Sequence, residues 1–460
     1  MFRRLILPTS FALLACGAPT GQVRPAEAVA PLAPQTIAFA QSGPALPGVT
    51  AARTETNGDE VTLYDAVWLG GTVTLRAAEI RIEGLRGVGG EVEADRITAR
   101  DLTMARADGD PDGPQIRLAS VTLTGFAASG ACGERAPLAC ARWTLLAATD
   151  AAATAGGAHW QAGLLTVADF AGGRVGLVRA ESVSADRPAP GAMPPVMAVV
   201  ARLVGAPMGL AGLAEADALR IDAVSLADAD LEALLAGEAT WAAEEFRLAR
   251  PRLSRGGRPL SQARSIVLRD AVVTKGVAMR LTADIEDARA DVGAALGAPA
   301  EAAARAEGLN ALRGQARLRF LREGDEAELN ASWRLADEAD GRVFLSFAGD
   351  PATKIVSGRI ELRDTGALDG LFAVAGAAQG QDAGMMRRQV VGGVTLLALD
   401  AARDDPRAEA AVRAMLAFAQ EGGRLEVLLR PPEPAPVFAL GANPAHLVPR
   451  LGLTATATRP

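Results

Sequence analysis

The 460-residue chain contains very little histidine and lysine. Its two histidines, His159 and His446, are too few for zinc sites built from several imidazoles, so zincin-type chemistry is nearly excluded. Its two lysines, Lys275 and Lys354, do not follow glycine, so the chain has no Walker A loop. The composition therefore argues against two common classes of catalytic site.

The serines also lack the nucleophile-elbow pattern, because none has a glycine two positions before it. A Ser–His–Asp site assembled across the fold stays open, since geometry and not spacing defines it. A pair of catalytic carboxylates stays open for the same reason. We predict a protein that is not an enzyme, with no catalytic residue, no metal ligand and no cofactor, and keep a glycan or ester hydrolase as the least favoured alternative.

Basic residues are outnumbered, with 47 Lys+Arg against 54 Asp+Glu and a net charge of −7. This balance argues against nucleic acid as a partner, because phosphate neutralisation needs a basic surface. The chain is 49% hydrophobic with a mean hydropathy of +0.16, which excludes a disordered protein. Its length allows two or three domains, or one elongated domain.

The N-terminus has the features of an export signal. Two arginines precede an apolar run from Leu5 to Ala15, which is too short to span a bilayer. The run ends Leu-Leu-Ala-Cys16, which resembles a bacterial lipobox and implies lipidation of Cys16, with Gly17 implying the outer membrane. We predict a signal peptide at 1–16, a flexible tether at 17–48 and a periplasmic protein anchored to the outer membrane. Cleavage after Ala40, which gives a soluble periplasmic or secreted protein, is the alternative.

The two remaining cysteines, Cys132 and Cys140, lie close together in an exported chain. Such an isolated pair predicts a disulfide, because oxidising compartments favour one and the spacing is not that of a redox-active C-x-x-C motif. We expect a structural bridge of about 2–3 kcal/mol.

A recurring pattern of apolar residues indicates β-strands with a bend. In one copy Ile116 and Leu118 alternate, two residues intervene, and Val121 and Leu123 alternate again; another copy spans Leu219 to Leu226. The double gap shifts the parity of the strand, so a bulge or corner is needed to keep one face inward. We predict a mainly β or α+β fold with one or two elongated, curved antiparallel sheets and a few amphipathic helices. A parallel β-solenoid is the alternative, which hairpin-like turns such as Gly256-Gly257 disfavour.

The same patterns suggest the organisation of the rest of the chain. We predict an N-terminal β domain at 49–190, a covering helix at 191–214 and a second β region of repeat strands and a meander at 215–364. A helical region with a C-terminal strand and a Pro-rich tail follows at 365–460. Within it, Thr365 is predicted to cap one helix, and Pro406 and Gly422 to bound another. The Ala-rich segment 287–307 is predicted to be partly helical.

Two charged segments are candidate sites. Seven arginines and no acid lie between Phe246 and Arg269, and this stripe is predicted either to contact anionic groups or to be the solvated face of a hairpin. The candidate contacts are Arg247, Arg250, Arg252, Arg255 and Arg258. The second segment, Asp108 to Gly113, matches the start of a calcium loop but has Ala119 at the twelfth position, so a hairpin turn is expected instead.

The exported N-terminus and three segments together resemble the AsmA/YdgA-like periplasmic proteins. These segments are the strand copy at 218–226, the meander start at 308–314 and the segment at 363–371 that leads into helices. The resemblance implies a β-rich envelope protein with an apolar groove for lipid acyl chains. The chain departs from those families in having a predicted lipid anchor in place of an N-terminal membrane helix, and no functional residue transfers.

The favoured hypothesis is therefore a non-enzymatic envelope lipoprotein that binds or shields lipid, or supports outer-membrane assembly. Its expected partners are the membrane, through the lipid anchor, and a phospholipid or other apolar ligand. The alternative is a structural or adhesive surface scaffold that presents loops to a protein partner, which the sequence does not identify.

Overall fold

The structure is a computed structural model that describes residues 49–70, 73–88, 91–106, 115–129, 141–155, 158–186, 216–231, 233, 240–274, 277–291, 302, 304, 311–336, 338–349, 354–402, 406–436 and 450–459. These residues form two compact units, with the boundary after Arg258. Unit 1 comprises the described residues up to Arg258, and unit 2 those from Pro259 onward.

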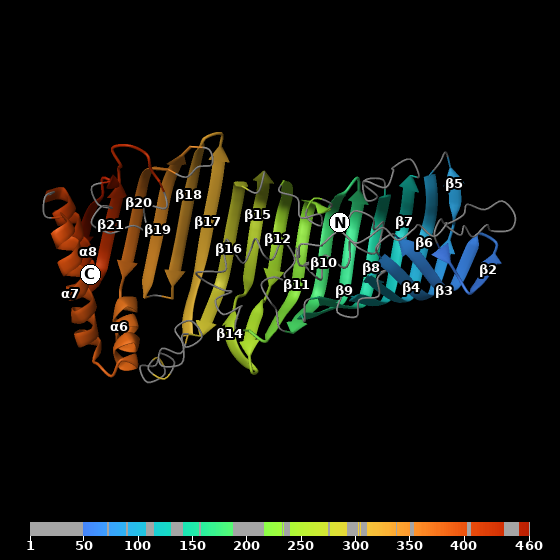
Figure 1. The fold of residues 1–460 in the computed structure, drawn as a ribbon, viewed down its shortest axis with the longest axis horizontal. Coiled ribbons are helices and arrows are strands. Elements are labelled where there is room, and N and C mark those ends of the chain that lie inside the picture. Colours follow the sequence, from blue (N-terminus) through green and yellow to red (C-terminus); the bar gives the residue numbers. More distant parts are fainter. Residues whose placement is uncertain are drawn as a thin grey trace, which may run out of the picture. The chain divides into compact units, whose positions relative to one another are not determined.

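Unit 1 is an antiparallel sheet in which most strands pair with their neighbours in sequence (Figure 1). Its strands are β1 (Val49–Thr50), β2 (Arg53–Asn57), β3 (Glu60–Gly70), β4 (Val73–Glu83), β5 (Arg86–Val88), β6 (Glu91–Arg106), β7 (Gln115–Ser129), β8 (Ala141–Ala155), β9 (Ala158–Ala171), β10 (Arg174–Asp186), β11 (Ala218–Asp230), β12 (Trp241–Ala249) and β13 (Arg252–Arg255). β1 and β2 both pair with β3 at one edge, and β12 and β13 both pair with β11.

Each strand from β6 to β11 contains one residue in the left-handed conformation, where the parity of the buried residues changes. In β8, Leu146 and Ala148 are buried before Asp150 (φ 49), and Ala151 and Ala153 are buried after it. Asp and Gly adopt this conformation most readily. The parity shift seen in the apolar pattern is thus a corner that keeps one face of the sheet inward.

These corners fall on two rows across the sheet. The pairing registers align the positive-φ residues of alternate strands, with a break in the ladder at each. The first corner row contains Asp65, Asp101, Asp150, Ser182 and Arg250, and the second contains Gly84, Gly125, Asp169 and Asp228. Asp169, for example, lies opposite Gly176, where a Cβ would sit 3.0 Å from the Asp169 Cβ.

Unit 2 is a second antiparallel sheet, which a set of helices follows. Its strands are β14 (Arg258–Gln262), β15 (Ser265–Thr274), β16 (Val277–Asp291), β17 (Ala311–Glu323), β18 (Glu326–Leu335), β19 (Ala339–Ala348), β20 (Lys354–Asp364), β21 (Gly423–Leu429), β22 (Ala435–Pro436) and β23 (Thr454–Thr458). The helices are α6 (Ala367–Ala378), α7 (Ala383–Ala402) and α8 (Pro406–Glu421). β17 to β20 form an uninterrupted meander that β21 and β23 extend.

The helices follow from local sequence signals, with one correction. α8 begins at Pro406 as expected, and Gly422 (φ 71) ends it by donating its N–H to the Phe418 carbonyl. The predicted cap Thr365 is wrong: its hydroxyl donates to the Glu338 carbonyl at 3.1 Å, while the Asp364 Oδ1 accepts from the Leu368 N–H at 3.0 Å. None of the described helices is long and apolar enough to cross a bilayer.

The antiparallel pairing in both units confirms the predicted fold class and excludes the β-solenoid for these strands. In the segment 287–307, predicted to be partly helical, residues 287–291 continue β16, whereas the described residues 302 and 304 are helical. Cys16, Cys132, Cys140, the turn at 108–113 and the whole predicted covering helix at 191–214 lie outside the described residues.

Candidate functional site

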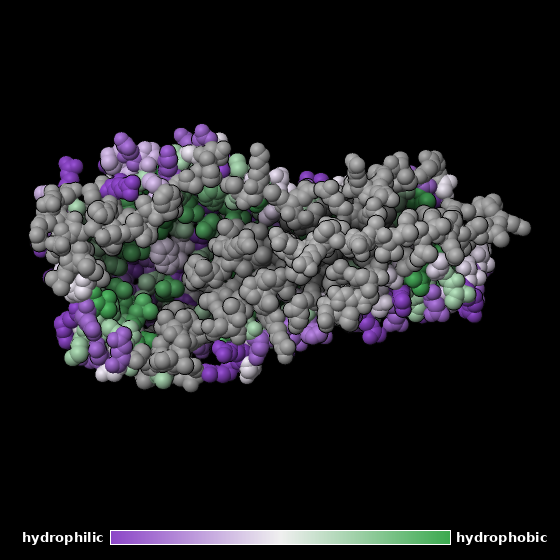
Figure 2. Space-filling model, viewed as in Figure 1, coloured by the Kyte–Doolittle hydropathy of each residue, from purple (hydrophilic) through white to green (hydrophobic). Residues whose placement is uncertain are grey.

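An apolar face runs across β16 to β21 of unit 2 in cross-strand rows. One row joins Phe320, Leu329 and Leu345, and a second joins Leu318, Ala331 and Val343 to residues of the neighbouring strands. Directly opposed residues of antiparallel strands share one face, so the rows form a continuous apolar surface. Figure 2 shows hydrophobic side chains gathered between hydrophilic rims in this unit, on the left of the view.

The covering of this face changes along the sheet. On β16, Leu281 and Ile285 are 3% and 5% exposed, and on β21, Leu425 and Val427 are each 6% exposed. Between them the side chains of β17 to β19 are only half-buried. We call these residues the open apolar face: Ala316, Leu318, Phe320, Leu329, Ala331, Trp333, Val343, Leu345 and Phe347. On this face the described side chains of β16 and β21 are therefore more deeply buried than those of β17 to β19.

Helix α8 accounts for the covering at the β21 side. Phe418 of α8 clusters with Leu425 and Val427, and Val412 packs with Leu453 and Ala455. The α8 stripe predicted from the sequence therefore contacts the last strands of the sheet. At the same side, Leu345 and Phe347 of the open apolar face pack against a buried cluster that includes Ile355 and Leu451.

The packing of Trp333 on Gly341 shapes the surface of the open apolar face. A Cβ at Gly341 would overlap the indole of Trp333, so the ring lies over the glycine and only glycine fits there. At one end of the face, Arg322 is 9% exposed and its Nε donates to the Gly324 carbonyl at 3.0 Å. A buried guanidinium therefore borders an aliphatic surface.

The opposite face of unit 2 is charged. Asp284 accepts from the Arg269 Nη1 and the Arg317 Nε, both at 2.5 Å, and its side chain is 11% exposed. The hydrogen bond and charge of Asp284 raise the pKa of Arg317. A polar groove of about 330 Å³ adjoins this cluster and also contacts Arg334 and Arg342. The two faces of the same strands thus differ sharply in polarity.

The arginine stripe predicted to contact anionic groups lies in unit 1 and divides into different environments. Arg250 Nε and Arg252 Nη2 pair with the two oxygens of Asp222 at 2.6 and 2.7 Å. Arg247 is exposed on β12, and Arg255 and Arg258, on either side of the Gly256-Gly257 turn, each have an interaction partner. Of the five, Arg252 lines a groove of about 660 Å³ that the other four do not line.

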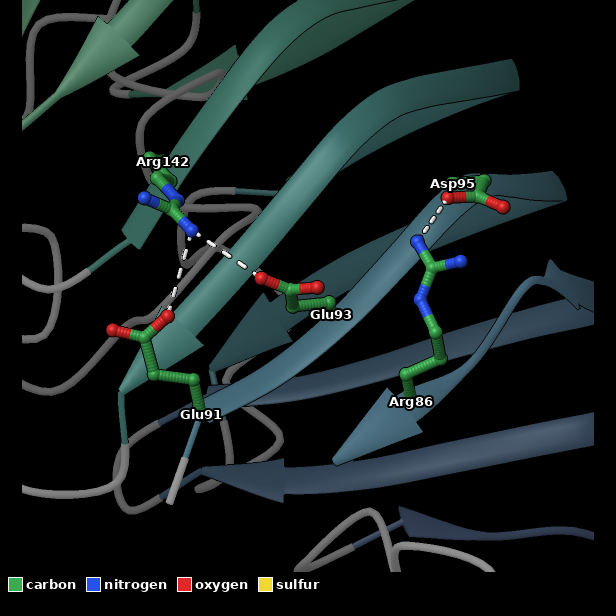
Figure 3. A network of polar contacts seen from close by, with 5 residues as sticks. All are labelled: Arg86, Glu91, Glu93, Asp95 and Arg142. Carbon is green, nitrogen blue, oxygen red and sulfur yellow. Dashed lines mark hydrogen bonds and ion pairs between the residues drawn. The ribbon is translucent and has the colours of Figure 1, made fainter. Parts of the chain in front are cut away.

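The polar face of unit 1 elsewhere carries exposed ion pairs (Figure 3). Arg142 on β8 points between Glu91 and Glu93 of β6, with Nη2–O distances of 3.5 and 3.3 Å. Arg86 on β5 pairs with Asp95 at 2.5 Å, and Asp95 lies across from Gly84 and Gly125 of the second corner row. These contacts are solvent-exposed, so they join strands without forming an enclosed site.

Sequence reasoning missed the aspartates of the corner rows and Asp222. The signal for the corners is an aspartate inside the double gap, as in Arg100-Asp101-Leu102 and Thr149-Asp150-Ala151. Asp222 also lies inside a double gap, between Ile221 and Val224, but its φ is not positive, and strand register sets its partners. Among the described residues, no group of three His, Cys, Asp or Glu side chains is placed to hold a metal ion.

Comparison with known proteins gives few matches. A family profile described as "Uncharacterized protein" matches residues 271–458, and no curated protein matches the chain. The AsmA/YdgA-like resemblance therefore stays a hypothesis. A solved structure that matches is LptH from Pseudomonas aeruginosa, the LptA-homologous periplasmic component of its lipopolysaccharide transport device. It is 10% identical, with a TM-score of 0.18, and the match covers 27% of this chain and 75% of that one; a likeness at this level carries no argument about fold or function.

Proposed function

We propose that the chain is a non-enzymatic, exported envelope protein that holds lipid acyl chains against the open apolar face of unit 2. One observation carries the proposal: the apolar side chains of β17 to β19 on this face are half-buried, whereas those of β16 and β21 on the same face are buried. Monomeric proteins rarely leave large contiguous apolar patches open, and such patches mark binding surfaces.

The chemistry of the face favours an acyl chain over a compact ligand. It consists of aliphatic residues together with Phe320, Trp333 and Phe347, and the Trp333 indole N–H is the one side-chain hydrogen-bonding group among these residues. An extended hydrocarbon needs only shape and apolar area, which straight neighbouring strands supply along their length. Arg322, buried at one end of the face, supports an amphiphile whose polar end lies at that border.

The envelope location rests on the sequence. The cationic N-terminus, the short apolar run and the lipobox-like Cys16 support export and attachment to the outer membrane through a lipid anchor. A protein tethered in this way would be close to the membrane lipids that it is proposed to bind.

The test is binding of a fluorescent fatty acid, parinaric acid, to the full-length protein and two single variants. Leu329→Glu places a charge on the open apolar face, and we expect at least about a tenfold loss of affinity because a desolvated carboxylate opposes the hydrocarbon. Asn330→Glu adds the same charge one residue away on the opposite face, and we expect no change. Circular dichroism checks that both variants fold.

Mass spectrometry of lipid extracts from the purified protein gives a second readout. Copurifying phospholipid or fatty acid, lost in Leu329→Glu alone, supports the proposal. Equal loss in both variants, or a wild-type protein that binds no probe and carries no lipid, contradicts it. In that case the adhesive or structural scaffold becomes the better hypothesis.

A further inference from the structure

The polar groove of unit 1 lies where the first corner row crosses β10, β11 and β13. Ser182 of this row has φ 54, and Asp222 faces it in the gap of the ladder between β10 and β11. Both residues line the groove, whose volume is about 660 Å³. The groove is therefore a product of the strand corners, and it is separate from the open apolar face of unit 2.

Two arginines stand side by side in this groove. The strand registers place Arg220 directly opposite Arg252 on one side and opposite Ser184 on the other. Both arginine side chains are exposed on the polar face, and both line the groove. Like charges directly opposite each other destabilise a sheet unless a counterion offsets them.

The counterion present covers only part of this charge. Asp222 divides its two oxygens between Arg250 and Arg252, at 2.6 and 2.7 Å. Arg220 makes no ion pair with a residue that the structure describes. The groove is lined by two arginines, Arg220 and Arg252, and by two acids, Asp222 and Asp186. Asp222 is already shared by Arg250 and Arg252, so Arg220 is the guanidinium group without a paired carboxylate among the described residues.

Arg250 occupies a backbone conformation that is costly for its residue type. Its φ of 49 is in the left-handed region, where Gly and Asp serve at the other corners and Ser at one. A costly conformation kept in place by an ion pair is a feature typical of functional sites. Here the pair with Arg250 fixes the carboxylate that orients Arg252.

Neutral hydrogen-bonding groups complete the lining. Ser182 and Ser184 contribute hydroxyls, and Gln161 contributes an amide. Guanidinium groups bind phosphate oxygens in a fixed fork, and hydroxyl and amide donors fill the remaining oxygen positions. Beside the carboxylates of Asp186 and Asp222, the lining thus offers a set of donors that suits a tetrahedral oxyanion.

We propose that this groove binds a phosphate-bearing anion, which bridges Arg220 and Arg252 and is further held by the serine hydroxyls. Opposed residues on antiparallel strands have Cβ atoms only about 4.5–5.5 Å apart, so one phosphate reaches both guanidinium groups. Arg247 is not part of this site, although it belongs to the same stripe in the sequence.

The test measures binding of three probes to the full chain: inorganic phosphate and glycerol 3-phosphate by calorimetry, and phosphatidic acid in phosphatidylcholine vesicles by cosedimentation. We expect Arg220→Gln to weaken binding about tenfold, because it removes one charge-assisted contact. Arg252→Gln should act in the same direction. Arg247→Gln is the matched control, since it removes one exposed arginine from the same sheet and should leave affinity unchanged.

Which probes bind distinguishes a free phosphate ester from a lipid head group as the source of the anion. Binding of the soluble phosphates, weakened by Arg220→Gln, assigns the groove to a free phosphate ester. Binding of phosphatidic acid vesicles alone, weakened in the same way, assigns it to a lipid head group. Equal weakening by Arg220→Gln and Arg247→Gln would mean diffuse charge attraction and would overturn the proposal, as would a wild-type chain that binds none of the three probes. Because this groove lies in unit 1, its failure leaves the acyl-chain proposal for unit 2 unaffected.

Discussion

The two units are both antiparallel sheets, but their apolar faces differ in burial. In unit 1 a left-handed residue interrupts each strand from β6 to β11 and redirects its side chains. In unit 2 such residues recur in β15 (Asp270, φ 51) and β16 (Asp287, φ 47), but none within β17 to β20 has a positive φ, and the β17–β18 and β18–β19 registers are unbroken. Cornered strands accompany a closed apolar face in unit 1, and straight strands accompany an open one in unit 2.

Individual leucines show the same difference in burial between unit 1 and β17 to β19 of unit 2. Leu63, Leu146 and Leu219 of unit 1 are each 1% exposed, whereas Leu329 and Leu345 of unit 2 are half-buried. Apolar area withdrawn from water stabilises a fold in proportion to its size. The comparison indicates that unit 1 uses its apolar face for stability, and that unit 2 leaves part of its own for binding.

Truncation of one leucine in each unit gives the largest expected difference. Leu146→Ala should destabilise unit 1 by about 3 kcal/mol, because it removes a fully buried side chain and leaves a cavity. Leu329→Ala should cost unit 2 only about 1 kcal/mol, because much of that side chain already contacts water. Urea unfolding followed by hydrogen exchange in the strands of each unit measures both. Equal costs would break the comparison between the faces.

Glycine substitutions test the corner rows next. Gly125→Ala should cost about 2–3 kcal/mol, because φ is 62 and the new Cβ would lie 2.5 Å from the Thr144 Oγ1. Gly172→Ala is the matched control, with φ 58 but no atom within 4 Å, and should cost about 1 kcal/mol. Similar losses in the two variants would show that crowding between strands does not hold the corner. The urea midpoints of unfolding of Gly125→Ala and Gly172→Ala, each compared with the wild-type protein, measure these losses.

The strands, their antiparallel pairing and the helix ends could be predicted from local pattern. The β18–β19 meander, the Pro406 start and the Gly422 stop all follow from alternation or backbone preference. The double gap also revealed that the strands must bend. These features depend on residues close in sequence, which is why a single sequence contains them.

The sites could not be predicted in the same way. Arg220 and Arg252 are 32 positions apart, and only the register between β11 and β13 brings them together. Arg247 is much nearer to Arg252 in sequence and lies elsewhere on the sheet. The open apolar face likewise depends on what covers each strand, which alternation alone does not encode. Thr365 was a plausible cap by type, but Asp364 reaches the helix N–H.

Ion pairs provide a third contrast, with a smaller expected effect. Asp284→Asn should destabilise unit 2 by about 1–2 kcal/mol, because a mostly buried carboxylate that serves two arginines loses its charge. Glu93→Gln in unit 1 should cost no more than about 0.5 kcal/mol, since its pair with Arg142 is exposed and screened. Added salt should reduce the Glu93 effect and leave most of the Asp284 effect. A larger loss for Glu93 would contradict the assignment of that network to the solvated surface.

Glycine placed in a corner and in a straight strand gives the smallest and most specific contrast. Asp101→Gly should change the free energy of unfolding by less than about 0.5 kcal/mol. Asp101 has φ 48, and glycine adopts this left-handed conformation without steric cost. This gain offsets the greater conformational entropy that glycine gives the unfolded chain. Asn330→Gly, in the middle of β18, should cost about 0.5–1 kcal/mol because glycine gains nothing from an extended conformation. Both side chains are exposed, so burial does not separate the two variants. If the corner variant lost more stability than the strand variant, the left-handed backbone of the corners would not be what distinguishes unit 1.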